Sequence, residues 1–583
     1  MGCYDFSLSN LISGIARRRD KPDGFEAQLV AAAEARAATV LGPLRENQSS
    51  VDSSSIHVQF KGSTHLRIER SDKMNFNIRS KVQRRLFLQL AMAALVNVPV
   101  SRANSFGAKF ATHDVDELAD SLALRPFTPP TYKPPVPLDT FGYDEYRDIR
   151  FRPNQAVWQD PTAIPPSTSL QFFLSSFIHQ EAVDIHLVED GISRRLDARR
   201  DMFDFGPSDA RVPKSADFAF SGFRVHGPLN RQDAADEIIA FNGASYFRVL
   251  GRGHTYGLSA RGLALNTIGA DPEEFPKFTK FWIEKPLGLS PMRIHALLDS
   301  PSVTGAYHFL LQAGSPTIMD IQATLFPRKK LDRVGLAPLT SMFLFDSRNH
   351  QNFRDFRAAV HDSDGLAIET ANGEHIWRPL LNPATLQSTF FDAQTPRGFG
   401  LVQRKRRYEQ FFDLEANYET RPSAWVEPVG DWGAGTIELV EIPIGAEWGD
   451  NIVAYWRPSE PLVAGRPFRY SYRLHWSDGT PQTARRVMQT RVGLNGDKPL
   501  FVIDYEAFPG DEGLRSAVAT TTAGITSKPI MQRNAQSGGI RCFFTLDPQG
   551  HASADLRLVL LHENQADATP DKAAEIWMYR WLA

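Results

Sequence analysis

The chain has 583 residues, of which 42% are hydrophobic and 23% charged, and its formal net charge is −2 at pH 7. These values are typical of a soluble globular protein with more than one domain, and the near-zero charge argues against nucleic acid or an anionic membrane as a partner. With only Cys3 and Cys542, the chain can build neither a disulfide framework nor a cluster of thiolate metal ligands.

A targeting signal begins at Met74. Arg84 and Arg85 precede an apolar run that is followed by small residues. This order predicts an export signal over residues 74–103. The paired arginines indicate the twin-arginine route, which leads to the periplasm. The apolar run is short for a membrane span of about 20 residues, so no span is expected in the mature protein. Residues 1–73 are predicted to be a disordered extension or an over-long start.

Residues 104–458 are predicted to form one large β-rich domain. It opens with a short helix from Asp114 to Leu124 and a proline-rich connector. Beyond residue 165, short runs of β-branched and aromatic residues alternate with Gly, Pro, Asn and Asp. Strands that recur without long helices between them favour an antiparallel sandwich over an α/β fold.

A second, smaller β domain is predicted for residues 459–583. The alternation from Phe468 to Trp476 indicates a strand with one buried face. Several similar runs follow up to the C-terminus, a pattern that suits an immunoglobulin-like sandwich. The whole protein is therefore expected to be all-β, with a large sandwich followed by a smaller one.

Carboxylates, arginines and tryptophans recur between His361 and Trp456, in segments broken by Gly and Pro. Acids act on glycosidic oxygens, planar donors hold hydroxyl groups, and aromatic faces cover sugar rings. This is the residue chemistry of a carbohydrate cleft. The same composition also fits a β-rich core with ordinary surface charges.

The segments SGFRVHGPLN, FNGASYFRVLG, HDSDGL, NGEHIWRPLLNP, RPSAWVEP and DNIVAYWRP occur in this order. From about Tyr143 to the C-terminus the chain thereby resembles the periplasmic glucan biosynthesis family, which includes G and D proteins. The twin-arginine signal favours the D type. The resemblance implies a galactose-mutarotase-like β-sandwich followed by an immunoglobulin-like domain. It also implies a role in making or trimming osmoregulated periplasmic glucans, which have β-1,2-linked glucose backbones.

The D-type proteins are also similar to a glycoside hydrolase family that cleaves β-1,2-glucan internally with inversion. On the matching motifs, the resemblance implies Asp450 of DNIV as general acid and Asp362 of HDSD as general base. It implies Tyr418 as a relay of protons through water. The local sequence is compatible, because Trp448 and Ile452 flank Asp450, and desolvation raises the pKa of a carboxyl as a general acid requires.

Asp364 follows Asp362 by two positions, so the two carboxylates share a face if the segment is extended. Seven further side chains are candidates for sugar binding, although core packing or structural ion pairs explain them equally well. They are Trp377, Arg378, Arg397, Arg421, Trp425, Trp432 and Trp456. The histidines show no metal-ligand spacing, and neither a metal nor another cofactor is expected.

Two functions from different classes remain open. The first is a periplasmic inverting endo-hydrolase of β-1,2-glucan. The second is a non-catalytic glucan-binding protein that organises backbone synthesis with an inner-membrane glucosyltransferase. The presence of both Asp362 and Asp450 favours the enzyme.

Overall fold

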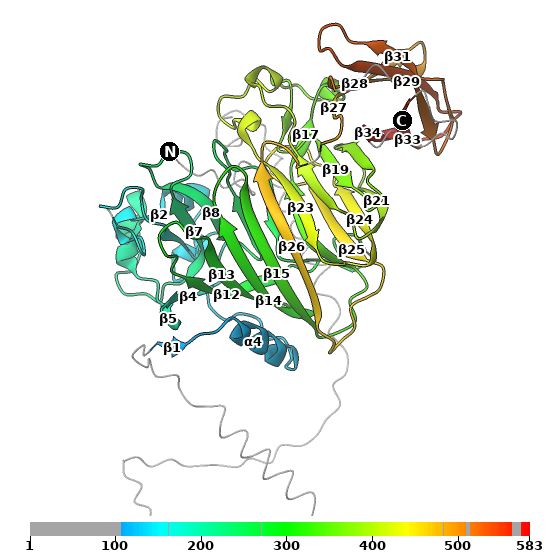
Figure 1. Cartoon of the computed structure of the whole chain (residues 1–583). Helices are drawn as coiled ribbons and strands as arrows, with labels where there is room; N and C mark the ends of the chain where they lie inside the picture. The colour runs from blue at the N-terminus through cyan, green and yellow to red at the C-terminus, as the bar shows by residue number, and fades with distance from the viewer. Residues whose placement is uncertain (1–106, 161, 270, 482, 509–513, 563–572) are drawn as a thin grey trace, which may run out of the picture. The chain divides into compact units, whose positions relative to one another are not determined.

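The structure, a computed structural model, describes residues 107–160, 162–269, 271–481, 483–508, 514–562 and 573–583. The predicted export signal and the extension before it lie outside these residues. Within the described residues nearly all regular structure is β (Figure 1), which confirms the expected all-β class. The helices there are α4 (His113–Ala123), α5 (Tyr143–Asp148) and the 3₁₀ segments η1 (Leu138–Thr140), η2 (Pro153–Gln155), η3 (Arg200–Met202), η4 (Gly206–Arg211), η5 (His350–Asn352), η6 (Tyr408–Gln410) and η7 (Tyr418–Thr420).

The first large sheet carries the long central strands seen in Figure 1. Its neighbouring strands pair antiparallel, except for one parallel pair, β4 with β12. In spatial order the strands are β1 (Ala108–Lys109), β5 (Ile192–Leu196), β4 (Asp184–Glu189), β12 (Lys277–Glu284), β13 (Met292–Asp299), β14 (Val303–Gln312), β15 (Thr317–Pro327), β26 (Phe468–Ser477), β23 (Ser423–Val429), β22 (Gly398–Val402), β19 (Gly365–Glu369) and β20 (His375–Pro379).

The second large sheet is antiparallel throughout. In spatial order it contains β21 (Gln387–Gln394), β24 (Ala434–Glu441), β25 (Ile452–Pro458), β16 (Val334–Ser341), β10 (Ser259–Arg261), β9 (Tyr246–Val249), β8 (Asp236–Asn242), β7 (Phe220–Gly227) and β3 (Ser169–Leu174), with β11 (Ala264–Leu265) also paired to β16. Two short pairs complete this part, β2 (Arg150–Phe151) with β6 (Phe203–Asp204), and β17 (Phe343–Phe345) with β18 (Val360–His361).

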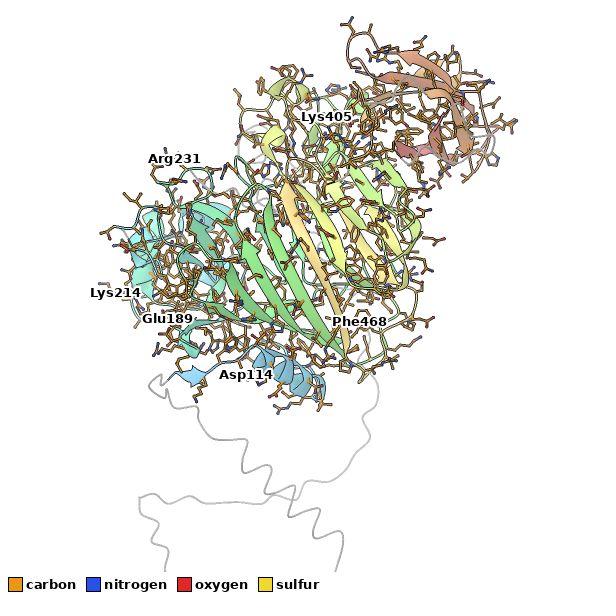
Figure 2. All side chains as sticks on the ribbon, viewed as in Figure 1. Asp114, Glu189, Lys214, Arg231, Lys405 and Phe468 are labelled. Atoms are coloured by element: carbon orange, nitrogen blue, oxygen red, sulfur yellow. The ribbon has the colours of Figure 1, made fainter. Side chains whose placement is uncertain are left out.

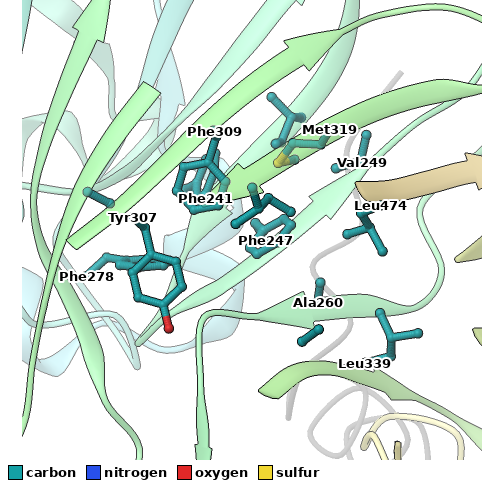
Figure 3. Close-up of a cluster of buried hydrophobic side chains, with 14 of the residues drawn as sticks. Phe241, Phe247, Val249, Ala260, Phe278, Tyr307, Phe309, Met319, Leu339 and Leu474 are labelled. Atoms are coloured by element: carbon teal, nitrogen blue, oxygen red, sulfur yellow. The ribbon is translucent and has the colours of Figure 1, made fainter. Parts of the chain in front are cut away.

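Aromatic and aliphatic side chains from the two large sheets form one common core, part of which is shown in Figure 3. Phe309 of β14 in the first sheet lies 5.4 Å, between ring centroids, from Phe241 of β8 in the second. Its ring also lies 5.7 Å from that of Phe247 on β9. Burial of such large apolar surfaces between two sheets is the main force that holds a sandwich together.

A second, smaller core lies between the C-terminal strands. Trp577 lies at its centre, with its ring 5.9 Å from Phe501 and 6.0 Å from Phe544. On one side are β34 (Glu575–Leu582), β33 (Ser553–His562) and β29 (Leu514–Thr521), and on the other β27 (Val487–Asn495), β28 (Lys498–Tyr505), β32 (Ile540–Asp547), β30 (Ile525–Thr526) and β31 (Ile530–Arg533). We call these strands the C-terminal sandwich. It joins the first large sheet through parallel pairing of β34 with β20.

The strand that was expected to open the second unit belongs to the first large sheet. β26 pairs with β15 on one side and with β23 on the other. Its alternation is as predicted, because every second residue from Tyr470 to Trp476 is buried. Alternation indicates a strand with one buried face, but it carries no information about which sheet that strand joins. The strands of the C-terminal sandwich therefore begin with β27.

Helix α4, expected from the sequence, packs on the face of the first large sheet formed by β13, β14 and β15 (Figure 1). Val115 and Ala119 of this helix are fully buried against the sheet. Asp116 accepts a hydrogen bond of 2.9 Å from Nε2 of His308 on β14. The helix thereby covers an apolar sheet face that would otherwise be exposed to water.

Candidate active site

Asp362 and Asp450 flank the same short segment, Ser341–Phe343, where β16 passes into β17. The Asp362 N–H donates to the Met342 carbonyl at 2.8 Å, and the Asn451 N–H donates to the Ser341 carbonyl at 3.0 Å. Successive residues of an extended chain direct their polar groups to opposite sides, so the two acids lie on opposite sides of this segment. With adjacent strands about 4.8 Å apart, the two backbones are about 10 Å from each other.

Asn451 fixes the Asp450 side of this arrangement. Its side-chain oxygen accepts the Phe343 N–H at 2.8 Å, and its side-chain nitrogen donates to the Phe343 carbonyl at 3.0 Å. The same nitrogen donates to the Ile442 carbonyl at 3.0 Å. A fully buried amide with all of these bonds holds the loop that carries Asp450 against the sheet.

Asp362 is a buried carboxylate with a buried cation beside it. Only 4% of its surface is exposed, and it accepts a hydrogen bond from Nη1 of Arg421 in an ion pair. Burial raises the pKa of Asp362, and the positive charge of Arg421 opposes that rise. Arg421 stays protonated, because the negative charge of Asp362 offsets its own burial and raises the pKa of the guanidinium. The pKa of Asp362 remains raised overall, while Arg421 places a fixed positive charge beside the carboxyl that stabilises its ionised form.

Asp450 lies in the loop before β25 and is half-buried. Burial raises the pKa of Asp450, and the negative charge of Asp362 raises it further, while Arg248 acts in the opposite direction. Among the residues that the structure describes, none donates a hydrogen bond to this carboxyl. Burial thus raises the pKa of both acids, but only Asp362 has a cation bonded directly to it among the described residues.

Tyr418 belongs to the same cluster. It is fully buried at the start of η7, and its hydroxyl donates a hydrogen bond of 2.9 Å to Oε2 of Glu447. The Arg421 guanidinium lies 4.1 Å from the centroid of its ring. Burial and the charges of Glu447 and Asp362 hold the pKa of Tyr418 well above its usual range. Arg357 also binds Glu447, with Nη1 at 2.5 Å. The phenol is therefore a neutral hydrogen-bond donor.

Arg248 is a functional candidate that the sequence did not reveal. It comes from β9, and its Nε donates to the Ser259 hydroxyl at 2.8 Å. Its positive charge lowers the pKa of both Asp362 and Asp450. Because Arg248 lies more than a hundred positions upstream of either acid, no local motif connects them. The available signal was a charged residue in a strand, YFRV, whose other residues are aromatic or apolar.

The two acids of the HDSD motif do not share a face. The segment from Asp362 to Asp364 forms bends between β18 and β19, so the extended geometry required for a shared face is absent there. Asp364 instead accepts hydrogen bonds from the backbone N–H groups of Arg404 and Lys405, at 2.6 and 2.9 Å. It also forms an ion pair with the Lys405 ammonium (labelled in Figure 2), whose charge holds the pKa of Asp364 low despite burial.

His361 is fully buried beside this ion pair. Burial lowers the pKa of His361 to about 3. Nζ of Lys405 lies 3.3 Å from its Nε2 and donates to it, which requires a neutral imidazole. The ring stacks on Phe343 with centroids 5.3 Å apart. His361 is therefore a structural residue under the site.

Four of the predicted sugar-binding residues are buried in the core and correct the expectation for them. Trp377, Trp425, Trp456 and Arg378 have at most 4% of their surface exposed, so none offers a face to a sugar. Each belongs to a strand, and its side chain points into packed protein. Nη2 of Arg378 donates to Glu441 at 2.9 Å in a buried ion pair. Core packing explains these residues.

Two further candidates lie outside the acid cluster. Trp432 donates from Nε1 to the Ser471 carbonyl at 3.0 Å and packs on Trp456, with ring centroids 5.3 Å apart. Arg397 is exposed and pairs with Glu369 at 3.3 Å. It precedes β22, whose far end reaches the cluster, so it lies about 20 Å from it along the strand. The structure thus brings together Asp362, Asp450, Tyr418 and Arg421.

Two pockets adjoin this cluster without including the acids. One, of about 390 Å³, adjoins the loop that carries Glu447, and the other, of about 250 Å³, adjoins the loop after β22. The first pocket is lined by Asn349, Asn352, Phe353, Asn382, Pro383, Ala384, Pro443, Ile444 and Gly445. The second is lined by Val402, Arg404, Arg406, Asp478, Gly479, Thr480, Arg486 and Met488.

The described part of the chain contains neither a group of metal ligands nor a helix that could span a membrane. There, no three His, Cys, Asp or Glu side chains are grouped so that they could hold a metal ion. No helix among the same residues has the length and apolar character needed to cross a membrane.

Comparison with known proteins gives a family match over nearly the whole described chain. The family model described as "Periplasmic glucan biosynthesis protein, MdoG" matches residues 110–581. A "Glucans biosynthesis protein G" of Bradyrhizobium diazoefficiens is 44% identical over 479 residues, which cover 81% of this chain and 93% of that protein. The protein of the same name from Rhodopseudomonas palustris is 43% identical over 490 residues (83% and 95%), and that from Vibrio cholerae 44% over 487 (81% and 87%).

Proposed function

The chain belongs to the periplasmic glucan biosynthesis protein family, and from this membership we propose that it acts on the β-1,2-linked backbone of osmoregulated periplasmic glucans as an inverting endo-hydrolase. The observation that carries the hydrolase proposal is the contrast between two neighbouring acids. Burial raises the pKa of both, but Asp362 is paired with a buried cation that favours its ionised form, and Asp450 has no such partner among the described residues. Environments that separate the protonation states of two carboxyls are what acid–base catalysis requires.

Asp450 is the proposed general acid. A glycosidic oxygen leaves as a poor alkoxide unless a proton reaches it in the transition state. The raised pKa of Asp450 keeps this proton on the carboxyl closer to neutral pH than in an ordinary aspartic acid. Because Asp450 is only half-buried, a bound sugar can approach it from solvent.

Asp362 is the proposed general base, which takes a proton from the attacking water directly or through Tyr418. Its ion pair with Arg421 stabilises the ionised form, and the raised pKa makes it a stronger base than an exposed aspartate. In an inverting enzyme the two carboxyls are about 6.5–9.5 Å apart, which leaves room for the water. The backbone separation of about 10 Å supports this arrangement. For a relay, the Tyr418 hydroxyl, now bonded to Glu447, must turn toward the water.

The position of the two acids, Asp362 and Asp450, also suggests where the substrate lies. The loop between β24 and β25 carries both Glu447 and Asp450, and its residues 443–445 help to line the pocket that contains Asn352 and Phe353. Amide groups and an aromatic ring are suited to hydroxyls and to the apolar face of a sugar. Glucan chains that extend from the acids are expected to enter this pocket.

A second candidate function is favoured by the name of the relatives, which refers to biosynthesis. In this alternative the protein binds glucan without cleaving it and organises backbone synthesis with an inner-membrane glucosyltransferase. Both candidates imply export to the periplasm, for which we propose the twin-arginine route on the basis of Arg84 and Arg85. The proposed D type rests on the same pair.

Incubation of the purified mature protein with linear β-1,2-glucan separates the two candidates. A hydrolase produces shorter oligomers in proportion to time and enzyme, and a double Asp362→Asn, Asp450→Asn variant does not. A binding protein retards the glucan in affinity electrophoresis but leaves its length unchanged.

A further inference from the structure

A buried ion pair links the C-terminal sandwich to the loop after β22. Glu575, the first residue of β34, accepts two hydrogen bonds from Arg404, at 2.9 and 2.5 Å. Its Oε2 also accepts the Val487 N–H at 2.7 Å. The Arg404 guanidinium lies over Trp377, with its carbon 3.4 Å from the ring centroid. Both charged side chains are almost fully buried, so the pair is bidentate, desolvated and fixed in direction.

The backbone of this loop holds the HDSD segment. The N–H groups of Arg404 and Lys405 both donate to Oδ2 of Asp364, two residues after the proposed base. The Lys405 ammonium binds the same carboxylate and also lies 3.4 Å from Asp346. Asp364 therefore depends on the position of residues 404 and 405, and that position depends in turn on Glu575.

Gln403, the next residue back, connects the proposed base to the proposed relay. Its side chain is fully buried, and its Nε2 donates to the carbonyl of His361 and to the carbonyl of Tyr418, each at 3.2 Å. One amide thus fixes the residue before Asp362 and the residue that carries the phenol.

We propose that the C-terminal sandwich positions the active site, with Glu575, Arg404 and Gln403 as positioning residues that hold Asp362 and Tyr418 at their working separation. The expected effect on turnover rests on the proposed hydrolase function, whereas the expected effect on the mobility of the two segments rests on geometry alone. We call the contacts made by Glu575, Arg404 and Gln403 the clamp. Loss of the clamp lets Asp362 and the Tyr418 phenol move independently. A displacement of about 1 Å at reacting groups costs on the order of 100-fold in rate.

The test uses three variants of the mature protein. Glu575→Gln keeps the shape but removes the charge, Gln403→Met keeps the length but removes the donor, and Arg541→Met is the control. Arg541 forms a bidentate pair with Asp504, at 2.7 and 2.8 Å, inside the C-terminal sandwich. Each variant is measured for hydrogen–deuterium exchange, for hydrolysis of linear β-1,2-glucan and for its pH–rate profile.

The structure predicts faster amide exchange in the peptides that contain Asp362 and Tyr418 for Glu575→Gln and Gln403→Met, and unchanged exchange there for Arg541→Met. In the same two variants kcat falls, on the order of 100-fold for Gln403→Met, while KM stays within about threefold and the acidic limb of the profile moves.

The possible failures can be told apart. If the rate of amide exchange around Asp362 and Tyr418 is unchanged in both Glu575→Gln and Gln403→Met, the clamp is overturned, whatever the hydrolytic activity of these variants. Equal loss of active protein with an unchanged pH profile in all three variants also overturns it, because that is the result of general destabilisation. A wild-type protein without turnover overturns the hydrolase function, and the exchange measurement then still decides the clamp.

Discussion

Arg421 and Asp362 form a buried ion pair in which a guanidinium N–H donates directly to the carboxylate. Both side chains are removed from water, so each depends on the other for its charge. The same guanidinium covers the ring of Tyr418. The pair thus defines the state of the proposed base and the position of the phenol, and it is the feature on which the predicted pH behaviour depends.

Replacement of Arg421 by Met is expected to lower the free energy of unfolding by about 3–5 kcal/mol at pH 8, because it leaves a buried carboxylate without its cation. Asp362 can escape part of this cost by taking up a proton. Its pKa then lies above that of the unfolded chain, so the destabilisation grows as the pH rises and is smaller at pH 5. Urea denaturation at both pH values measures the difference.

The matched control is Arg397→Met. Arg397 is also paired with a carboxylate, but the pair is exposed, and its loss is expected to cost less than about 1 kcal/mol. Equal losses for the two variants, or a loss for Arg421→Met that does not depend on pH, would show that the buried pair does not carry the stability assigned to it.

Arg248→Gln is expected to move the basic limb of the pH–rate profile to higher pH. Activity requires a protonated Asp450 and falls as that group ionises. The positive charge of Arg248 lowers the pKa of Asp450, so its removal raises that pKa and extends activity upward. Arg252→Gln is the control, since its Nε binds the Leu229 carbonyl. A basic limb that stays in place for Arg248→Gln would disprove this electrostatic role.

Burial of His361 in its neutral form is expected to make the folded protein less stable as the pH falls. Its pKa is lowered to about 3 by burial, so between about pH 6.5 and pH 3 the unfolded chain binds a proton that the folded chain does not. Stability is therefore lost as the pH falls through this window, by about 1.4 kcal/mol per pH unit for one proton. His361→Gln keeps an acceptor for Lys405 and is expected to show a shallower dependence than the wild type.

The comparison is made from urea midpoints between about pH 6.5 and pH 5, above the range in which the aspartates of the unfolded chain take up protons. Asp346 and Asp364, whose pKa values are held low in the fold, therefore contribute little to the slope. His113→Gln serves as control, because His113 is largely exposed on α4. If His361→Gln and the wild type have the same slope, His361 is not the buried neutral base described above.

Measuring export tests the prediction that residues 74–103 are a twin-arginine signal. The pathway recognises the arginine pair itself, so replacing Arg84 and Arg85 by Lys is expected to leave the protein in the cytoplasm. A chain that starts at Met74 is expected to be exported normally, because the predicted signal is complete from that point. Cell fractionation with immunoblotting measures both, and normal export of the double-Lys variant would refute the twin-arginine route.

Much of the fold could be predicted from local patterns. The alternation in Phe468 to Trp476 correctly indicated a strand with one buried face, and short runs between Gly and Pro indicated an all-β protein. The sheet to which β26 belongs could not be predicted, because pairing with β15 and β23 depends on contacts far apart in the chain.

The candidate site was predicted unevenly for the same physical reason. Asp362, Asp450 and Tyr418 were predicted through motifs that resemble a family, and they stay a prediction, although the structure brings them together with Arg421. Trp377 and Trp456 have side chains that suit sugar stacking and core packing equally, and burial decided for the core. Arg248 and Gln403 act through space on segments distant in sequence, so no local pattern could have indicated them.

The two acids have distinct expected effects when each is replaced. Asp450→Asn removes the transferable proton and Asp362→Asn the base, while the contacts to sugar remain. Because positioned proton transfer is worth about 10²–10⁴-fold in rate, each variant is expected to lose about that much in kcat and to keep its affinity for glucan. Tyr418→Phe loses activity only if the proton passes through its hydroxyl.

The most direct measurement of the central claim is the anomeric form of the first product, followed by proton NMR during cleavage of linear β-1,2-glucan. A single displacement by water between Asp450 and Asp362 predicts that the α-anomer appears first and then equilibrates. Initial release of the β-anomer would contradict the account, because it requires a covalent intermediate and a nucleophile in place of the base. Absence of any new reducing end, with glucan binding intact, would contradict it in favour of the non-catalytic binding protein.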